Sequence, residues 1–248
     1  MDGIIIINKE KGYTSHDAVY KIKKMFNTKV GHTGTLDPNA TGVLPILLGK
    51  GTKLSKYLIE HDKEYELLLQ LGTKTTTADE EGEEVEKKCV PEQYLQFKNI
   101  EKILKSFIGE SQQVPPMYSA IKIDGQKLYD LARQGIEVER KPRPVTISEI
   151  KVISFTGINA IIKCKVSKGT YIRTLIDDIG VKLGTFATMT ELLRQEVGEY
   201  HINKSYSLED VENMMNDSNL DFLSRVEDVF AYENLVIDDE RQEKLLFK

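Results

Sequence analysis

Apolar residues follow two rhythms along this chain, one that repeats every second residue and one that repeats every three to four residues. The first rhythm, together with short continuous apolar runs, predicts strands, because successive side chains of a strand point to opposite faces. The alternation is clearest between Tyr65 and Leu71. The expected strands are 4–8, 43–48, 65–71, 145–155 and 159–166, the last two paired around a turn at Thr156-Gly157.

The second rhythm predicts helices, because residues three and four apart share one face of a helix. Thr14 and Asp17 have the spacing of a capping box, which places a helix start just before an apolar periodic segment. Ser207 and Asp210 repeat that spacing further along the chain. The expected helices are 18–26, 53–59, 100–107, 171–183, a segment that follows Ser207, and 239–247.

Glycine, proline and asparagine interrupt both rhythms in 31–42, so a loop is expected there. The polar segment 73–88 predicts a solvated loop or an edge hairpin, and 114–141 contains a hairpin signal at Asp124-Gly125 before a short helix that ends near Gly135. Strands and helices thus alternate without a regular β-α-β order. This arrangement favours an α+β fold with a mixed or antiparallel sheet.

Composition narrows the class of protein. The 248 residues include 34 Lys and Arg against 39 Asp and Glu, for a net charge of −5, and 40% are hydrophobic, which excludes a disordered or fibrous chain. The longest aliphatic run, Ile4–Ile7, is far shorter than the ~18 residues of a membrane span, and we expect no secretory signal because Asp2 leads into it without a basic stretch. Cys89 and Cys164 are isolated, so we expect no disulfide framework and a cytoplasmic protein.

The negative net charge argues against indiscriminate binding to nucleic acid but allows a local basic surface. Two tyrosines of 115–143 are interleaved with cations: Tyr118 and Tyr129 with Lys122, Lys127, Arg133, Arg140, Lys141 and Arg143. Aromatic rings among cations suit an RNA loop, through stacking and phosphate contacts. An ordinary solvated surface has the same pattern and is the more frequent origin of it.

The segment 31–42, GHTGTLDPNATG, displays Asp37 and His32 from an irregular loop beside an expected strand. Pro38 keeps Asp37 away from helical dihedral angles. On spacing alone, an aspartate that caps its own turn is more frequent than a catalytic one. Tyr171 and Arg173 open an expected helix, and an ordinary salt bridge would also account for that arginine. Common hydrolase, nucleotide-binding and zinc motifs are absent, and the four histidines are too scattered to indicate a metal site.

Together these segments resemble the TruB family of tRNA pseudouridine synthases. The matches, in family order, are IIINKEKGYTSHDAVYKIKK, GHTGTLDPNATGVLPILLGKGTK, DKEYELLLQLG, PPMYSAIKIDGQKLYDLARQG, KGTYIRTLIDDIGVKLG and ELLRQEVG. They run from about Ile4 to Gly198, and six ordered matches are far more specific than any single one.

The resemblance implies a pseudouridine-synthase fold: a bent, mixed and mainly antiparallel sheet flanked by helices, with a deep cleft and an RNA-clasping insertion at about 114–142. It implies that the chain isomerises the TΨC-loop uridine of tRNA, position 55, to pseudouridine without a cofactor or a metal. Asp37 matches the catalytic aspartate, Arg173 the arginine paired with it, Tyr65 the tyrosine on the target base, and Tyr171 the second active-site tyrosine. Because burial raises and a guanidinium lowers a carboxyl pKa, we expect Asp37 and Arg173 to be direct partners.

The resemblance also implies residues that bind the substrate. His32 matches a histidine that inserts into the RNA loop, and Leu192 matches a leucine of the uracil pocket. The remaining expected substrate-binding residues are Gly31, Thr33, Tyr118, Lys122, Arg133 and Arg143. Three places depart from the family pattern. Glu10 stands at a usual proline, the usual T-D-T-x-D segment reads Thr75-Thr76-Thr77-Ala78-Asp79, and Leu193 stands at a usual arginine, which is expected to remove one phosphate contact.

We expect a catalytic domain over 1–210, followed by 211–248 as a helical segment or the start of a truncated PUA-like RNA-binding domain. The expected partner is the TΨC arm of tRNA, and the expected oligomeric state is a monomer. Attack of Asp37 at C1′ of the ribose or at C6 of the uracil stays open, as does the acceptor of the C5 proton. A non-catalytic RNA-binding module on the same scaffold and a synthase acting on rRNA are the alternative interpretations.

Overall fold

The structure is a computed structural model that describes residues 1–229. Its strands are β1 (Gly3–Lys9), β2 (Val30–His32), β3 (Thr41–Leu48), β4 (Lys63–Leu71), β5 (Thr73–Thr75), β6 (Glu84–Lys87), β7 (Gly109–Gln113), β8 (Lys122–Ile123), β9 (Gln126–Lys127), β10 (Arg143–Thr156), β11 (Asn159–Val166), β12 (Ala187–Val197), β13 (Tyr200–His201) and β14 (Leu223–Ser224). Its α-helices are α1 (Ser15–Phe26), α2 (Ser55–Leu58), α3 (Phe97–Lys105), α4 (Leu128–Arg133), α5 (Ile172–Lys182) and α6 (Leu208–Asn216). Short 3-10 turns are η1 (Gly49–Leu54), η2 (Glu92–Tyr94), η3 (Ile202–Lys204) and η4 (Val226–Val229).

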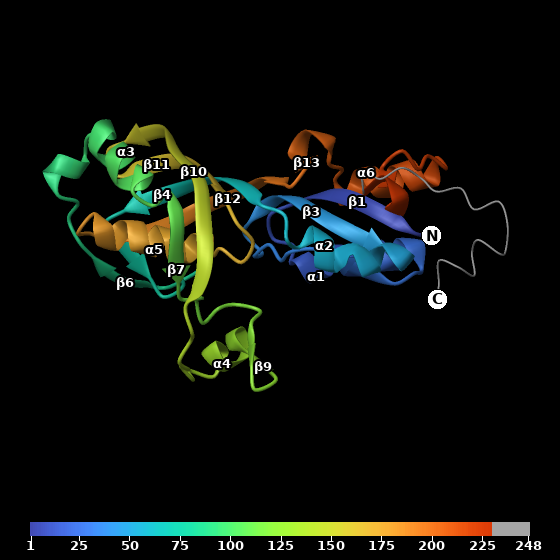
Figure 1. The fold of residues 1–248 in the computed structure, drawn as a ribbon, viewed down its shortest axis with the longest axis horizontal. Coiled ribbons are helices and arrows are strands. Elements are labelled where there is room, and N and C mark those ends of the chain that lie inside the picture. The colour runs from blue at the N-terminus through green and yellow to red at the C-terminus, as the bar shows by residue number, and fades with distance from the viewer. Residues whose placement is uncertain (230–248) are drawn as a thin grey trace.

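One long, bent sheet organises the described part of the chain (Figure 1). Its main path runs β14-β1-β3-β12-β4-β11-β10-β7, with β2 added beside β3 and β13 beside β12. Each pairing in this sheet is antiparallel except β3 with β12. The expected α+β fold with a mixed, mainly antiparallel sheet is therefore confirmed.

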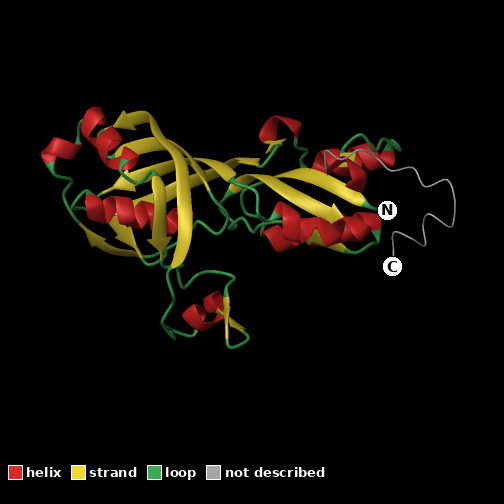
Figure 2. Ribbon diagram, viewed as in Figure 1, coloured by secondary structure: helices red, strands yellow, loops and turns green. Residues whose placement is uncertain are grey.

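The helices divide between the two ends of the sheet (Figure 2). At one end α5 packs on β12 and α3 packs on β10, while at the other end α1 contacts β2 and α6. One apolar core runs under both groups of helices, and a smaller second core that includes Ile4, Ile6 and Leu47 covers the other face of β1 and β3. Strand β1 is buried on both faces, which explains its continuous apolar sequence.

The two ends of the sheet meet at a narrow parallel joint. Only two register pairs join β3 to β12, Thr41 with Leu193 and Gly42 with Arg194. Gly42 has a φ of +103°, and a Cβ at this position would lie 2.2 Å from the carbonyl oxygen of Arg194. This close approach requires glycine, and it holds the loop that precedes β3 at the joint.

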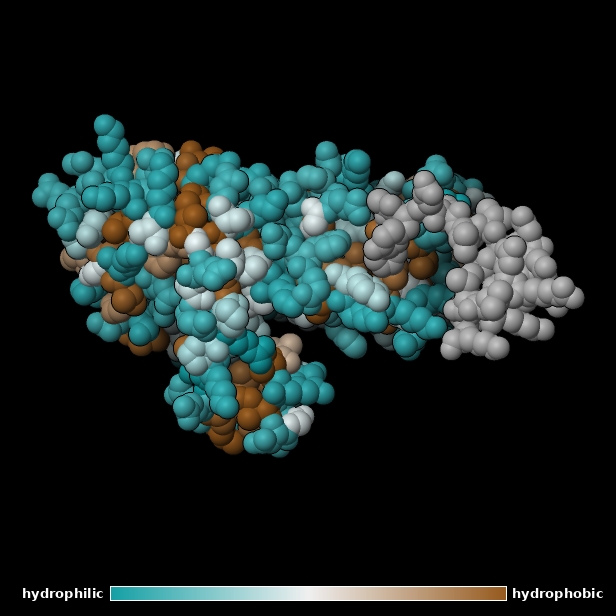
Figure 3. Space-filling model, viewed as in Figure 1, coloured by the Kyte–Doolittle hydropathy of each residue, from teal (hydrophilic) through white to brown (hydrophobic). Residues whose placement is uncertain are grey.

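The insertion projects from the body as a separate lobe (Figure 3). It leaves at the end of β7, forms the hairpin β8–β9 and helix α4, and returns at the start of β10. Leu128 and Leu131 fill its small interior. The expected hairpin at Asp124-Gly125 and the short helix before Gly135 are both present.

Most elements expected from the sequence are present, including both capping boxes, at Thr14 with Asp17 and at Ser207 with Asp210. The expected loop at 31–42 is wrong at its start, because Gly31 and His32 belong to β2. The expected helix at 53–59 is shorter and begins as the turn η1. Strands β7 and β12 were not expected from the sequence, and the expected helix at 239–247 lies outside the described residues.

The expected division of the chain at residue 210 falls within α6, which packs on α1, and the division itself stays a prediction. Over residues 1–229, no helix has both the length and the apolar character needed to cross a membrane.

Candidate active site

The loop that carries Asp37 is held from the N-terminal side by α1 and β1. The Ser15 hydroxyl, at the first residue of α1, accepts from the Leu36 N–H at 2.8 Å and donates to the Leu36 carbonyl at 2.9 Å. The fully buried Lys9 ammonium donates to the Pro38 carbonyl at 3.1 Å and to the Tyr13 carbonyl at 2.6 Å. Burial lowers the pKa of Lys9 to about 8, partly offset by the nearby Asp37 carboxylate.

Arg173 joins two carboxylates at the centre of the site. Its Nε lies 3.1 Å from Asp37 Oδ2, and its Nη1 lies 3.5 Å from Asp79 Oδ2. The side chains of Arg173 and Asp79 are 8% and 10% exposed, whereas that of Asp37 is 42% exposed. The expected direct pair of Asp37 and Arg173 is therefore present, and the aspartate keeps an open side toward solvent.

Asp79 is fixed in turn by its own loop. Its Oδ1 accepts from the Thr77 hydroxyl at 2.5 Å and from the Glu81 N–H at 3.1 Å. Burial and the carboxylates of Asp79 and Asp37 raise the pKa of Glu81. Arg173 is thus held in place by a rigid acidic partner, which leaves Asp37 as the only one of its two ion-paired carboxylates that is substantially accessible.

A second arginine holds the Asp37 loop from the sheet. Arg194 of β12 is 1% exposed, and its guanidinium donates to three backbone carbonyls: Val43 at 2.7 Å, Gly34 at 3.0 Å and Thr35 at 3.5 Å. These carbonyls lie before and after Asp37 in the chain. Arg194 therefore ties both arms of the loop to β12, a role that the sequence patterns did not indicate.

Tyr65 and Leu192 lie on neighbouring strands of the joint. Tyr65 of β4 is the register partner of Arg194 and is 8% exposed, while Leu192 is the partner of Leu67 and packs on the main core. Tyr65 and Leu192 both belong to the sheet face on which Arg194 reaches the Asp37 loop. Both residues therefore share a sheet face with the arginine that binds the loop.

Tyr171 is the N-cap residue of α5, two residues before Arg173. Burial raises the pKa of its phenol, Ser119, Arg143 and Arg173 oppose that shift, and Asp37 adds to it. The hydroxyl is therefore protonated at neutral pH and can donate a hydrogen bond.

His32 ends β2 and carries a defined tautomer. Its Nδ1 accepts from the Gly34 N–H at 3.2 Å, so the proton of the neutral ring lies on Nε2. Burial lowers the pKa of His32, and the charges of Arg194 and His16 lower it further. Gly31 precedes it in β2, and Thr33 is 1% exposed, with a hydroxyl that has no hydrogen-bond partner among residues 1–229.

The insertion reaches the site through its backbone. The Tyr118 carbonyl accepts from Arg173 Nη2 at 2.7 Å, while the Tyr118 side chain is 37% exposed. Lys122 and Arg133 are exposed on the lobe, the latter with its guanidinium 5.6 Å from the centre of the Tyr129 ring. Arg143, at the start of β10, is with Arg173 one of the charges that lower the pKa of the Tyr171 phenol.

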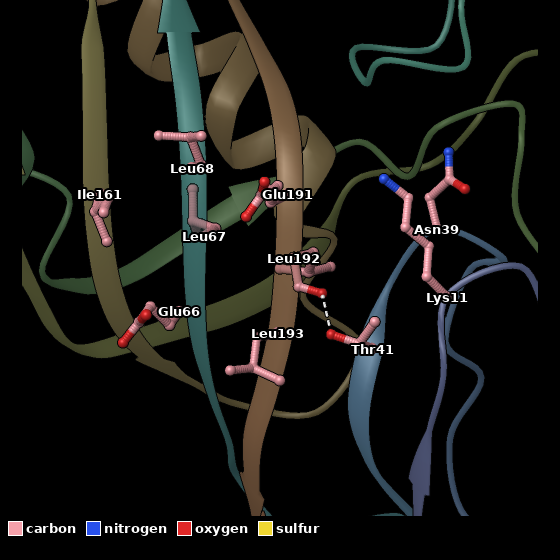
Figure 4. A pocket seen from close by; sticks show the side chains of 10 residues that line it. All are labelled: Lys11, Asn39, Thr41, Glu66, Leu67, Leu68, Ile161, Glu191, Leu192 and Leu193. Carbon is pink, nitrogen blue, oxygen red and sulfur yellow. Dashed lines mark hydrogen bonds between the residues drawn. The ribbon is translucent and has the colours of Figure 1, made fainter.

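A pocket of about 390 Å³ opens next to the Asp37 loop (Figure 4). Its walls include Lys11 and Asn39 on one side and Glu66 and Glu191 on the other, and Leu192 is the only expected site residue among them. Glu66 alternates with Tyr65 along β4, so it belongs to the opposite sheet face. Leu193, the residue that departs from the family pattern, also lines this pocket.

The arrangement offers a carboxylate nucleophile beside a fixed cation and a neutral phenol. Nucleophilic attack requires an accessible carboxyl group, and Asp37 presents one beside the Arg173 guanidinium. Over residues 1–229, no three His, Cys, Asp or Glu side chains are grouped so that they could hold a metal ion.

Comparison with known proteins identifies related sequences. The model of the TruB family pseudouridylate synthase N-terminal domain matches residues 22–172, and the model of the tRNA pseudouridylate synthase B C-terminal domain matches 173–228. A tRNA pseudouridine synthase B of Fusobacterium nucleatum is 50% identical over 100% of this chain and 85% of its own length. One of Bacillus cytotoxicus is 42% identical over 99% of this chain and 82% of its own length.

Solved structures share the fold. An H/ACA RNP bound to a substrate RNA that contains 2'-deoxyuridine includes a chain with a TM-score of 0.67 and 29% identity, matched over 91% of this chain and 59% of its own length. A chain of a Cbf5-Nop10-Gar1 complex matches with a TM-score of 0.66 and 31% identity, over 89% of this chain and 57% of its own length. This chain thus spans less than two thirds of either solved chain.

Proposed function

From the premise that this chain belongs to the TruB family of pseudouridylate synthases, we propose that it isomerises a uridine of tRNA to pseudouridine. The proposed target is position 55 in the TΨC loop, with Asp37 as the nucleophile and no cofactor. The single observation that carries the proposal is the Asp37–Arg173–Asp79 chain, in which only the side chain of Asp37 is substantially exposed.

Isomerisation of uridine requires few groups besides Asp37, Arg173 and Asp79. The reaction breaks the N1–C1′ bond and forms a C5–C1′ bond, so no electrons or groups are exchanged with another reactant. In one route, Asp37 attacks C1′ and releases the uracil, which turns and bonds through C5. In the other, Asp37 adds to C6 before the glycosidic bond breaks. In both routes the C5 proton is lost and the carboxylate is regenerated.

The target nucleotide must leave its stack before Asp37 can reach it, and extrusion costs a few kcal/mol. Stacking of the extruded base on Tyr65 would offset about 1–3 kcal/mol of that cost. The Tyr171 phenol and Leu192 would bound the base on its other sides. His32, neutral and flat, suits insertion into the space that the extruded base leaves.

The insertion is proposed to hold the RNA over this site. Its exposed cations Lys122 and Arg133 suit phosphate contacts, and the exposed ring of Tyr118 suits stacking. Gly31, Thr33 and Arg143 would complete the surface around the target nucleotide. Because the chain carries a net charge of −5, affinity for tRNA has to come from such local cations.

The test is incubation with an unmodified tRNA transcript, followed by pseudouridine mapping and by tritium release from uridine labelled at C5. We expect product at position 55 with wild type and none with Asp37→Asn, which should still bind tRNA. Asp221→Asn, an exposed aspartate outside the site, serves as the matched control. Normal turnover by Asp37→Asn would contradict the mechanism, and a wild-type protein that binds tRNA but releases no tritium would identify a pure RNA-binding module.

A further inference from the structure

The insertion is attached to the body at one pair of residues. Gln113 ends β7, Arg143 begins β10, and the two are direct partners in the antiparallel ladder. All of 114–142 therefore leaves and rejoins the sheet at the same place (Figure 1). Any movement of the lobe relative to the sheet is therefore transmitted through Gln113 and Arg143.

Gln113 points its side chain into the body rather than into the lobe. The residue is 6% exposed, its Oε1 accepts from the Tyr171 N–H at 2.8 Å, and its Nε2 donates to the Tyr171 carbonyl at 3.1 Å. A primary amide carries an acceptor and a donor in one plane. Gln113 therefore bonds with both backbone polar groups of Tyr171, as a neighbouring strand residue would.

Gln113 binds Tyr171 at a position where the hydrogen bonds of helix α5 do not fix the backbone. Tyr171 is the N-cap of α5, with an extended backbone (φ −93°, ψ 114°) and no side-chain cap. Its carbonyl also accepts the first helical hydrogen bond, from the Leu175 N–H at 3.1 Å. An N-cap residue has non-helical dihedral angles, so its orientation depends on contacts outside the helix. Gln113 supplies two such contacts.

A second contact joins the same segment to the first turn of α5. The Tyr118 carbonyl, five residues beyond Gln113, accepts from Arg173 Nη2 at 2.7 Å. The first residues of the insertion thus bind Tyr171 and Arg173 at two separate points. Both hydrogen bonds of Gln113 go to the backbone, so the residue does not itself reach the substrate.

We propose that Gln113 is a positioning residue, which fixes the phenol of Tyr171 and the guanidinium of Arg173 relative to the base of the insertion. RNA held by the lobe then meets these groups in the orientation that the reaction needs. The inference rests on the proposed function and adds a residue to it. Misplacement of a catalytic group by about 1 Å can cost on the order of 100-fold in rate.

The test compares Gln113→Met with Gln112→Met in the full-length chain. Methionine keeps the length of the side chain but removes both hydrogen bonds, whereas Gln112 is exposed and pairs only through its backbone with Pro144. We expect the single-turnover rate of tritium release to fall about 10- to 100-fold in Gln113→Met, because the positioning of Tyr171 and Arg173 is lost. The Kd for tRNA should stay within about twofold of wild type, because both hydrogen bonds of Gln113 go to the protein and not to the RNA.

Gln113→Asn provides a second variant should Gln113→Met fail to fold, because it keeps the amide but is one methylene too short to bridge both groups. A single-turnover rate equal to that of wild type in a folded variant would overturn the inference, even if the variant melts at a lower temperature. Parallel loss of rate and affinity would also overturn it, since Gln113 would then serve RNA binding alone. Wild type without activity in the same assay would instead refute the proposed function.

Discussion

At the scale of single residues, the least expected feature is a buried cation without an anion. Arg194 forms no ion pair within residues 1–229 and gives its hydrogen bonds to backbone carbonyls on both sides of Asp37. A buried charge is costly unless it is paired or hydrogen-bonded. Its retention at this position fits a role in shaping the loop, because a planar guanidinium can bind several carbonyls at once.

Removal of this cation should have two measurable effects. Arg194→Met leaves three carbonyls without their donor, so we expect the free energy of unfolding to fall by about 2–4 kcal/mol, measured by urea denaturation. The pKa of His32 should rise, because Arg194 is one of the charges that lower it. Titration of the His32 ring by NMR measures that rise.

Arg194→Lys is the matched variant, because it keeps the charge and loses the planar fork. Arg194→Lys should lower the stability of the loop, while the pKa of His32 should stay lowered because the positive charge is kept. Gln195→Met, on the neighbouring position of β12, removes a hydrogen bond with Glu66 but no charge, so it should leave the pKa of His32 unchanged. A His32 titration that is unchanged in Arg194→Met would contradict the electrostatic role.

The lowered pKa of His32 also fixes the direction of one pH effect. The unfolded chain takes up a proton on this ring near the ordinary pKa of 6.5, and the folded chain does so only at lower pH. The unfolded state therefore binds more protons as the pH falls below about 6.5, and this residue then lowers stability. Above that pH its contribution is absent.

At the scale of elements, two adjacent residues at the start of α1 have different roles. Thr14 closes the capping box with Asp17, which stabilises the helix. Ser15, one residue later, binds both polar groups of the Leu36 backbone next to Asp37. The helix terminus thus supports the Asp37 loop, and the two functions can be separated by substitution.

We expect Thr14→Ala to cost about 0.5–2 kcal/mol of stability, as the loss of a cap usually does, with an unchanged single-turnover rate. Ser15→Ala should lower both stability and the rate, because it leaves the Leu36 N–H and carbonyl without a side-chain partner beside Asp37. Thermal melts and tritium release on the same preparations measure the two effects. Equal rates in both variants would mean that Ser15 supports only the helix.

Some strands and helices could be predicted from the sequence, whereas others could not. The strand at 65–71 and the helix after Thr14 were predictable because their apolar period or cap is local. Strand β12 was missed because two bulges break its alternation and a buried arginine occupies a core position. Strand β7 is a polar edge strand with mostly exposed side chains, so it has no apolar period.

The same distinction applies to the candidate site. The pair of Asp37 and Arg173 was predictable from the chemistry that the family resemblance implies, since an enclosed carboxylate needs a cation. Gln113 and Asp79 were not singled out, because their roles depend on partners 58 and 94 positions away in the chain, Tyr171 and Arg173. Such contacts are set by the sheet topology, which no local pattern records.

At the scale of the whole molecule, the Asp37 loop lies where the two ends of the sheet join through only two parallel register pairs. The insertion projects as a separate lobe from the ends of β7 and β10 (Figure 1). The net charge of −5 is spread over the chain, so binding of RNA depends on where the cations lie rather than on their number.

This view predicts a particular salt dependence. The affinity for tRNA should fall as salt rises, by roughly 0.7–0.9 log units per tenfold salt for each phosphate contacted. Lys122→Ala and Arg133→Ala should each reduce that slope by about one such increment. Lys151→Ala, a lysine of β10 already paired with Glu149, should leave the slope unchanged. A slope that neither insertion variant alters would contradict the proposed contacts.

Because the lobe begins and ends on two residues that already face each other in a ladder, the sheet closes beneath it whatever its length. Evolution, or a protein engineer, can therefore lengthen, shorten or replace the part of the insertion beyond Tyr118, whose carbonyl binds Arg173, without rewriting the remainder of the fold. Substrate preference could then diversify at this one lobe, while the residues of the candidate site are kept.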